Sequence, residues 1–176
     1  MNKKLKDSLK ACQALQFGDF TLASGKHSKY YIDIKRASTD PAILSYIAEE
    51  MESEMKRKGI KPDVIAGVVL GSVPLAVALS LRTDIPYVMV RKQKKDHGTG
   101  KLIEGVLTAG MRVLVVEDVV TSAGSSAEAV GILRDAGAKV DHVLAVIDRQ
   151  EGGAARLAEI GVELLPLLTA EEVLRE

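Results

Sequence analysis

Four short runs of apolar residues, separated by segments with helical spacing, constrain the fold of this 176-residue chain more than any other feature. The runs are almost wholly apolar, with Arg112, Asp141 and His142 as the exceptions, as expected of strands that are buried on both faces. Strands of this kind that alternate with helices form a parallel sheet covered on both sides. In such sheets, ligands bind beyond the carboxyl ends of the strands. The four runs are residues 64–69, 86–90, 111–116 and 140–147.

Weaker patterns predict the remaining elements. Leu5, Leu9, Cys12 and Leu15 form an apolar stripe that indicates an N-terminal amphipathic helix. Before the first buried strand we expect extended runs at 19–22 and 29–34, and a helix that is capped by Asp40, begins at Pro41 and ends at Gly59. Later elements are an apolar segment at 73–81, a helix that ends near Ala136 before Gly137, a helix at 154–160, a strand at 162–165 and a helix at 170–174.

The charge balance argues against nucleic acid as a partner. Lys and Arg total 24, and Asp and Glu also total 24, so the formal net charge is zero. Proteins that bind nucleic acid usually carry a basic excess. Aromatic residues make up only 3% of the chain, too few for a platform on which bases stack. Any strongly positive site must therefore be local.

The length and the single cysteine suggest a simple organisation. A chain of 176 residues suits one domain, so we expect residues 1–176 to form a single unit. Cys12 cannot form an internal disulfide and is expected to be a core residue. The basic N-terminus lacks the apolar run of a signal peptide, and no stretch approaches the ~20 apolar residues of a membrane span. We therefore expect a cytoplasmic protein with no membrane partner.

The most specific segment is residues 113–126, with the sequence VLVVEDVVTSAGSS. An apolar strand is expected to end at Val116, and two carboxylates, Glu117 and Asp118, follow it directly. The small residues of 121–125 leave backbone N–H groups accessible, and the next helix adds its own N-terminal N–H groups. Such a loop binds phosphate, whereas the acids would repel phosphate and suit sugar hydroxyls or a divalent metal. The combination indicates a ribose 5-phosphate.

An ordinary turn between a strand and a helix, with Ser125 as the helix N-cap, would explain the loop composition alone. The two acids favour the phosphate-binding interpretation. Two other phosphate motifs are excluded, because the loop has neither the Gly-Lys-Ser/Thr of a Walker A motif nor the glycine spacing of a dinucleotide fingerprint.

A second segment, residues 91–101, follows the strand at 86–90 and reads RKQKKDHGTGK. It has five Lys or Arg residues and one acid, and histidine, present at His97, is a side chain that can donate or accept a proton. Gly98 and Gly100 permit motion. A mobile cationic loop suits a leaving pyrophosphate, because it stabilises developing charge and excludes water. The alternative is a solvated surface loop or a weak RNA-binding patch.

Both segments resemble signatures of the type I phosphoribosyltransferases, and residues 91–98 resemble the catalytic loop of the orotate phosphoribosyltransferases in particular. The resemblance implies an α/β fold with a central, mainly parallel sheet flanked by helices, a small hood from residues 1–40 plus the C-terminal tail, and a flexible catalytic loop. It implies that Lys95, His97 and Asp118 are catalytic. The residues that it places against phosphoribosyl pyrophosphate are Arg91, Lys92, Lys95, His97, Glu117, Asp118, Val119, Val120, Thr121, Ser122, Ala123, Gly124 and Ser125.

The resemblance extends to the base-binding parts. Residues 20–28 and 30–33 resemble the hood over the base, and Asp148-Arg149 resembles the site of the orotate-binding arginine, with Thr121 as a second orotate contact. A fixed guanidinium suits the orotate carboxylate. Residues 67–76 resemble the loop under the pyrophosphate. Two positions depart from the pattern, because Ala23 and Gly71 stand where some members have Lys. Lys26 is a candidate substitute for the missing cation.

These resemblances imply a complete reaction. The enzyme would join N1 of orotate to C1 of phosphoribosyl pyrophosphate, with release of pyrophosphate. Mg²⁺ would be the cofactor, bound mainly through substrate oxygens rather than by side chains. A homodimer is implied, with the catalytic loop shared across subunits. Two rivals remain: a purine phosphoribosyltransferase, which would give Arg149 no carboxylate to bind, and a regulator that senses phosphoribosyl pyrophosphate.

Overall fold

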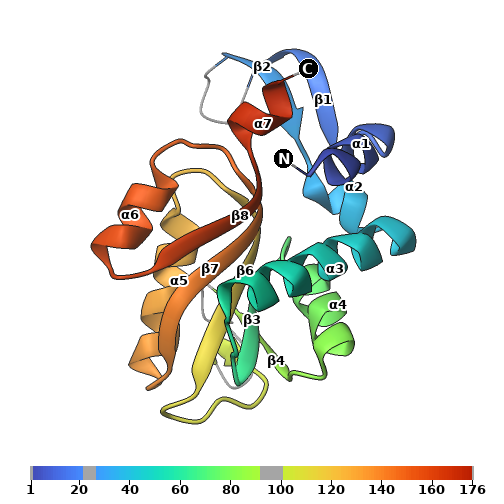
Figure 1. Cartoon of the computed structure of the whole chain (residues 1–176). Helices are drawn as coiled ribbons and strands as arrows, with labels where there is room; N and C mark the ends of the chain where they lie inside the picture. Colours follow the sequence, from blue (N-terminus) through green and yellow to red (C-terminus); the bar gives the residue numbers. More distant parts are fainter. Residues whose placement is uncertain (1, 22–26, 92–100, 176) are drawn as a thin grey trace.

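The computed structural model describes residues 2–21, 27–91 and 101–175. In this part of the chain, six strands form one sheet in the order β5-β4-β3-β6-β7-β8 (Figure 1). All neighbouring strands are parallel except β4 and β5, so the predicted parallel sheet is confirmed. The strands are β3 (Val64–Val68), β4 (Tyr87–Val90), β5 (Ile103–Glu104), β6 (Arg112–Val120), β7 (Lys139–Asp148) and β8 (Glu163–Thr169).

Successive side chains of each strand point to opposite faces of the sheet, and apolar residues occur on both faces. Helices cover both faces and bury these residues. Ile65, Leu114 and Leu144 face a core shared with α3 (Pro41–Lys58) and α4 (Val73–Thr83). Ala66 and Val115 face a second core shared with α5 (Gly124–Asp135) and α6 (Gly153–Glu159). Figure 1 shows these two helix pairs on opposite sides of the sheet. Every residue of β3 is buried, as a strand covered on both faces requires.

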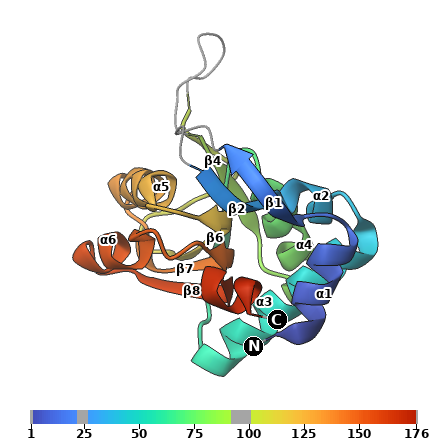
Figure 2. The same cartoon turned by 90° about the horizontal axis from the view of Figure 1, so that it is seen from above.

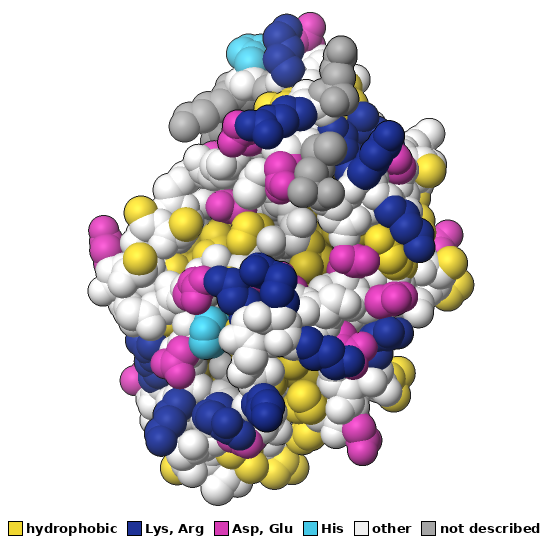
Figure 3. Space-filling model, viewed as in Figure 1, with side chains coloured by type: hydrophobic (Ala, Val, Ile, Leu, Met, Phe, Trp, Pro, Cys, Tyr) yellow, Lys and Arg dark blue, Asp and Glu magenta, His cyan; other side chains and the backbone are white. Residues whose placement is uncertain are grey.

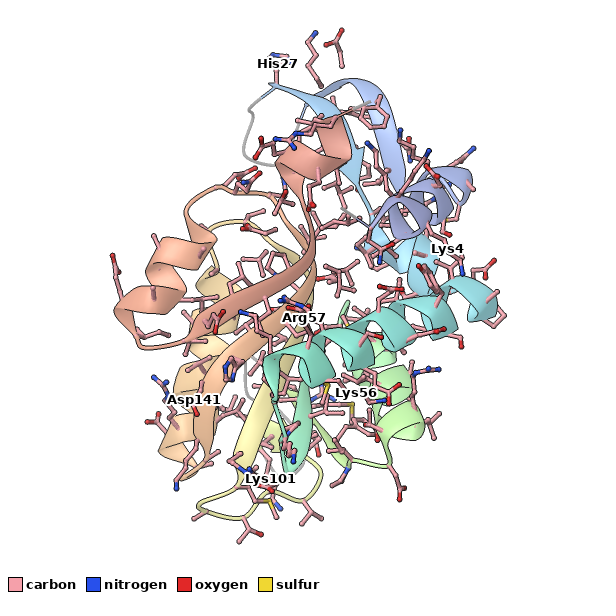
Figure 4. All side chains as sticks on the ribbon, viewed as in Figure 1. Lys4, His27, Lys56, Arg57, Lys101 and Asp141 are labelled. Atoms are coloured by element: carbon pink, nitrogen blue, oxygen red, sulfur yellow. The ribbon has the colours of Figure 1, made fainter. Side chains whose placement is uncertain are left out.

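The segments around the two termini form the hood, which lies at the carboxyl ends of the strands (Figures 1 and 2). Its antiparallel hairpin consists of β1 (Leu15–Thr21) and β2 (His27–Ile32), and His27 is exposed at its tip (Figure 4). Three short helices complete it: α1 (Lys3–Ala11), α2 (Ile34–Ser38) and α7 (Ala170–Leu174). Lys4 of α1 lies above α3, with Nζ 4.2 Å from the centre of the Tyr46 ring (Figure 4).

Local signals located several helix ends correctly. Asp40 Oδ1 accepts hydrogen bonds from the N–H groups of Ala42 and Ile43, at 2.9 and 3.0 Å, and Pro41 follows as predicted. Gly59 ends α3 with a φ of 68°. Lys56 and Arg57 lie in the last turn (Figure 4), where their charges oppose the negative end of the helix dipole.

Other boundaries differ from the predictions. Leu15 begins β1 rather than extending the first helix, although Cys12 packs against the core as expected. Ile34 begins α2, a helix that the extended run 29–34 did not predict. The short edge strand β5 was also missed. Ser125 is not the cap of α5, because the N-cap is Ala123, in the left-handed region with a φ of 56°.

Lys6 joins the two ends of the chain and gives a first testable prediction. Its side chain is 4% exposed, and Nζ donates to the carbonyl oxygens of Glu172, at 3.1 Å, and Arg175. Lys6→Met keeps the volume but removes both hydrogen bonds. We expect the free energy of unfolding to fall by about 1–3 kcal/mol. Urea denaturation, with exposed Lys3→Met as control, measures the difference. Equal stability of the two variants would contradict this role.

Candidate active site

A pocket opens at the carboxyl ends of β3 and β6, where the βα pattern predicted a ligand site. One wall is the turn between β3 and α4, and the other is the end of β6 with the loop that enters α5. The lining residues are Val68, Val69, Leu70, Gly71, Glu117, Asp118, Val119, Val120, Thr121, Ala123, Gly124, Ser125 and Ser126. The structure thus brings most of the predicted phosphate-binding segment into a single cavity.

The two acids lie within β6, not after it as the apolar run suggested. β6 continues to Val120 because β7 continues to pair with it, up to the pair Val120 and Asp148. Its pairing with β3 ends earlier, at Gly67 and Val116. Beyond that point β6 has a partner on one side only.

Glu117 and Asp118 have different surroundings. Glu117 is 5% exposed, and its Oε1 accepts a hydrogen bond of 3.0 Å from the buried Ser126 Oγ. Asp118 is more accessible, and its Oδ1 accepts a hydrogen bond of 2.9 Å from the backbone N–H of Val119. Ser126 therefore ties one acid to the first turn of α5. The sequence did not single out this serine, because it reads as an ordinary helical residue.

The loop after β6 presents backbone N–H groups to the pocket. α5 begins at Gly124 without a side-chain cap, and Gly124, Ser125 and Ser126 of its first turn line the cavity. The N-terminus of a twelve-residue helix, with its partial positive charge, thus faces the space beside the two acids. This arrangement suits a phosphate group.

Gly153, at the start of α6, packs tightly under this loop. A Cβ at this position would lie 2.5 Å from the Thr121 carbonyl oxygen and 2.6 Å from Val120 Cγ1. Gly153→Ala must therefore displace the loop backbone. We expect a loss of about 1–3 kcal/mol in the free energy of unfolding, together with weaker binding of ribose 5-phosphate. Gly152→Ser is the control, because a Cβ at position 152 would touch no atom and would only strain the backbone. Calorimetry on both variants therefore separates the effect of the steric clash at Gly153 from the effect of backbone strain at Gly152. Wild-type affinity in Gly153→Ala would refute the assignment.

Arg149 lies between the end of β7 and the hood. Its N–H donates to the Val120 carbonyl at 2.8 Å, which holds it beside the loop. Its guanidinium carbon is 5.0 Å from the centre of the Tyr30 ring, and its Nε is 2.9 Å from Glu151 Oε1. The Nε is buried, and the Glu151 oxygen lies at ion-pair distance without the alignment of a hydrogen bond. A largely buried guanidinium against an aromatic ring suits a planar anion.

The predicted catalytic loop falls mostly outside the described residues. Lys92, Lys95 and His97 belong to this part, as do Ala23 and Lys26 of the hood. Arg91, the first residue of the loop, follows β4. Its N–H donates to the Leu102 carbonyl at 2.8 Å, and its Nε lies 3.7 Å from Glu104 Oε1.

The turn between β3 and α4 approaches Asp118 closely. A Cβ on Gly71 would lie 2.8 Å from the Asp118 Cγ and would overlap its Oδ2. A side chain at position 71 would therefore displace this carboxylate. Ser72, which follows, is buried, and its Oγ donates to the Val68 carbonyl at 2.7 Å. The peptide bond between Val69 and Leu70 is cis.

Comparison with known proteins identifies the family. Residues 38–160 match the phosphoribosyl transferase domain. The orotate phosphoribosyltransferase of Methanosarcina mazei is 49% identical over 168 residues, which cover 96% of this chain and 89% of the relative. The chain belongs to the orotate phosphoribosyltransferase family. The predicted family and fold class are thus confirmed.

Solved structures agree with this membership. The orotate phosphoribosyltransferase of Aeropyrum pernix is 35% identical, with a TM-score of 0.88 over 97% of this chain and 96% of that one. The Mycobacterium tuberculosis orotate phosphoribosyltransferase in complex with 5-phospho-alpha-D-ribosyl 1-diphosphate is 29% identical, with a TM-score of 0.79 over 96% of this chain and 98% of that one. Among the described residues of this family member, no helix is long and apolar enough to cross a bilayer.

Proposed function

We propose that this enzyme transfers the 5-phosphoribosyl group from phosphoribosyl pyrophosphate to orotate, giving orotidine 5-phosphate and pyrophosphate in pyrimidine synthesis. The observation that carries the proposal is the pocket between β3 and β6, where two carboxylates stand beside an uncapped helix N-terminus. Arg149, against the Tyr30 ring of the hood, supplies the feature that suits orotate rather than a purine.

Each group in the pocket has a distinct task in this reaction. The N–H groups of residues 121–125 bind the 5-phosphate. Glu117 and Asp118 accept hydrogen bonds from the ribose hydroxyls and hold C1 toward the base. N1 of orotate, after loss of its proton, forms the new bond to C1, while the C1–O bond breaks and its electron pair leaves with pyrophosphate. Arg149 and Thr121 orient the orotate. No residue acts as a nucleophile.

The cationic loop supplies charge stabilisation in this proposal. Arg91, Lys92, Lys95 and His97 contact the pyrophosphate, whose negative charge grows as the C1–O bond breaks. Lys95 and His97 act on the leaving group. Closure of the loop excludes water from the reacting carbon.

Mg²⁺ is the proposed cofactor. Asp118 projects a carboxylate toward the pocket, and such an oxygen is a donor that Mg²⁺ accepts. In the described part of the chain, no three His, Cys, Asp or Glu side chains are grouped to hold a metal ion. A single carboxylate, that of Asp118, fits an ion that is held mainly by oxygens of the substrate. When bound, Mg²⁺ neutralises charge on the pyrophosphate.

We also propose a homodimer in which each subunit lends its loop to the site of its partner. A mixing experiment tests this arrangement. By the roles given above, Lys95→Ala and Asp118→Ala should each lose most of their activity. If sites are shared, mixed dimers contain one site with both residues intact, and activity returns on mixing. Failure to recover activity, with dimers shown to exchange, would place both residues in one subunit.

An absorbance assay with orotate, phosphoribosyl pyrophosphate and Mg²⁺ tests the function. Adenine, guanine, hypoxanthine and uracil serve as control bases. Orotate consumption that requires Mg²⁺ is expected. Turnover of a purine or uracil alone would refute the base assignment while leaving the phosphate site intact. Binding of phosphoribosyl pyrophosphate without any turnover would favour a regulator.

A further inference from the structure

The charges around the pocket are unevenly distributed. Among the described residues that line it, Glu117 and Asp118 are acidic, and none is Lys or Arg. Cations and anions are interleaved over the face of the molecule seen in Figure 3, and the formal net charge is zero. No general excess of positive charge therefore attracts an anion to the pocket. At the 5-phosphate end, Arg156 Nη1 lies 3.5 Å from the place that a Cβ on Gly124 would take. At the end beside Gly71, none of the described residues that line the pocket is a Lys or Arg.

Gly71 itself cannot supply that charge. Any side chain at this position would begin with a Cβ that overlaps the Asp118 carboxylate. The space is already filled by an acid, which would repel the pyrophosphate unless a cation stands beside it. Because Gly71 and Asp118 touch, a further protein cation at this spot, beside the loop cations and the Mg²⁺ proposed above, has to come from another element.

Lys35 of α2 satisfies this requirement. α2 packs against β6, the strand that carries Asp118. The Lys35 Nζ lies 3.2 Å from Asp33 Oδ1, and its side chain is 61% exposed, so it is free to change partner. The hydrogen bond to Asp33 is the main cause that raises the pKa of Lys35, and the charges of Asp118 and Tyr31 add to it. The ammonium group of Lys35 therefore interacts electrostatically with Asp118 as well as with Asp33.

Other cations near the hood are occupied elsewhere. Arg36, the next residue, donates from Nη1 to Gln13 Oε1 at 2.8 Å. Lys29 pairs with Asp19 on the hairpin. Lys6 is buried against the C-terminal tail. Asp118 is among the groups whose charge acts on Lys35.

We propose that Lys35 is a substrate-binding residue that leaves Asp33 and binds the pyrophosphate of phosphoribosyl pyrophosphate, at the end of the pocket where Gly71 has no side chain. The proposal deepens the function proposed above and rests on it. An ammonium on a flexible four-carbon stem suits a diphosphate, which it contacts as a point charge. The same ion would offset the repulsion between Asp118 and the diphosphate.

Calorimetric titration of three ligands tests the proposal without reliance on turnover. Lys35→Ala should weaken binding of phosphoribosyl pyrophosphate and of pyrophosphate by about 10- to 100-fold at constant Mg²⁺. Binding of ribose 5-phosphate, which lacks the diphosphate, should stay within about twofold. Lys35→Arg should restore most of the affinity. Lys29→Ala, which breaks another lysine–aspartate pair on the hood, one that is more exposed, is the control and should bind all three ligands normally.

Several results would overturn the proposal. They are unchanged binding of phosphoribosyl pyrophosphate in Lys35→Ala, an equal loss for ribose 5-phosphate, or an equal loss in Lys29→Ala. In steady-state assays, the KM for phosphoribosyl pyrophosphate should rise while that for orotate stays constant. If the wild-type protein binds phosphoribosyl pyrophosphate but does not convert orotate, the proposed function fails, yet the titrations still decide the role of Lys35.

Discussion

Lys95→Ala is expected to lower kcat by about 100- to 1,000-fold, the usual loss when one group that stabilises transition-state charge is removed. Pyrophosphate gains negative charge as the C1–O bond breaks, so the effect should fall on the chemical step. The KM for orotate should change little, because we propose that Thr121 and Arg149 form the orotate site. Steady-state kinetics with both substrates varied measures the two parameters.

Lys101→Ala is the control for this variant. Lys101 lies at the other end of the same cationic segment and is exposed. Its removal changes the net charge equally but should leave kcat within about twofold, as for most exposed single charges. Circular dichroism should show that both variants are folded. A normal kcat for Lys95→Ala would exclude the catalytic role of the segment.

Gly71→Ala is expected to lower kcat/KM by about 100-fold while thermal stability changes little. The added Cβ would overlap the Asp118 carboxylate, with the Cγ only 2.8 Å away. The carboxylate is the free end of a side chain, so it should rotate away while the backbone stays in place. A catalytic group displaced by about 1 Å loses roughly this much activity. Kinetics and a thermal melt on one preparation test both parts.

Gly131→Ala provides the matched comparison. Gly131 lies inside α5, and no atom lies within 4 Å of the place that its Cβ would take. This variant should keep full activity, and the better helix propensity of alanine should raise its stability slightly. If Gly71→Ala also keeps full activity, the position of Asp118 is not critical. If it unfolds instead, the turn is more rigid than its side-chain contact indicates.

Much of the fold was predictable because its signals are local. Asp40, Pro41 and Gly59 define the ends of α3 through their own backbone preferences. Buried strands such as β3 appear as continuous apolar runs, since both faces are covered. Short or irregular elements had no comparable signal. α2 spans five residues and β5 only two, and both depend on neighbours that are distant in the sequence.

The candidate site divides in the same way. The acids and small residues of 117–125 were recognisable as a candidate site from their order, and most of them line the pocket. The extension of β6 to Val120 was not recognisable, because it depends on pairing with β7.

The sequence by itself therefore determined the fold class, the two ends of α3 and the segment from which the phosphate loop was predicted. Only the tertiary structure revealed the hydrogen bond from Ser126 to Glu117, the position of Arg149 over Tyr30 and the electrostatic interaction of Lys35 with Asp118. These contacts join residues whose identities carry no mutual signal along the chain. They exist because parallel strands bring their carboxyl ends to one edge of the sheet, where the hood and the loops meet.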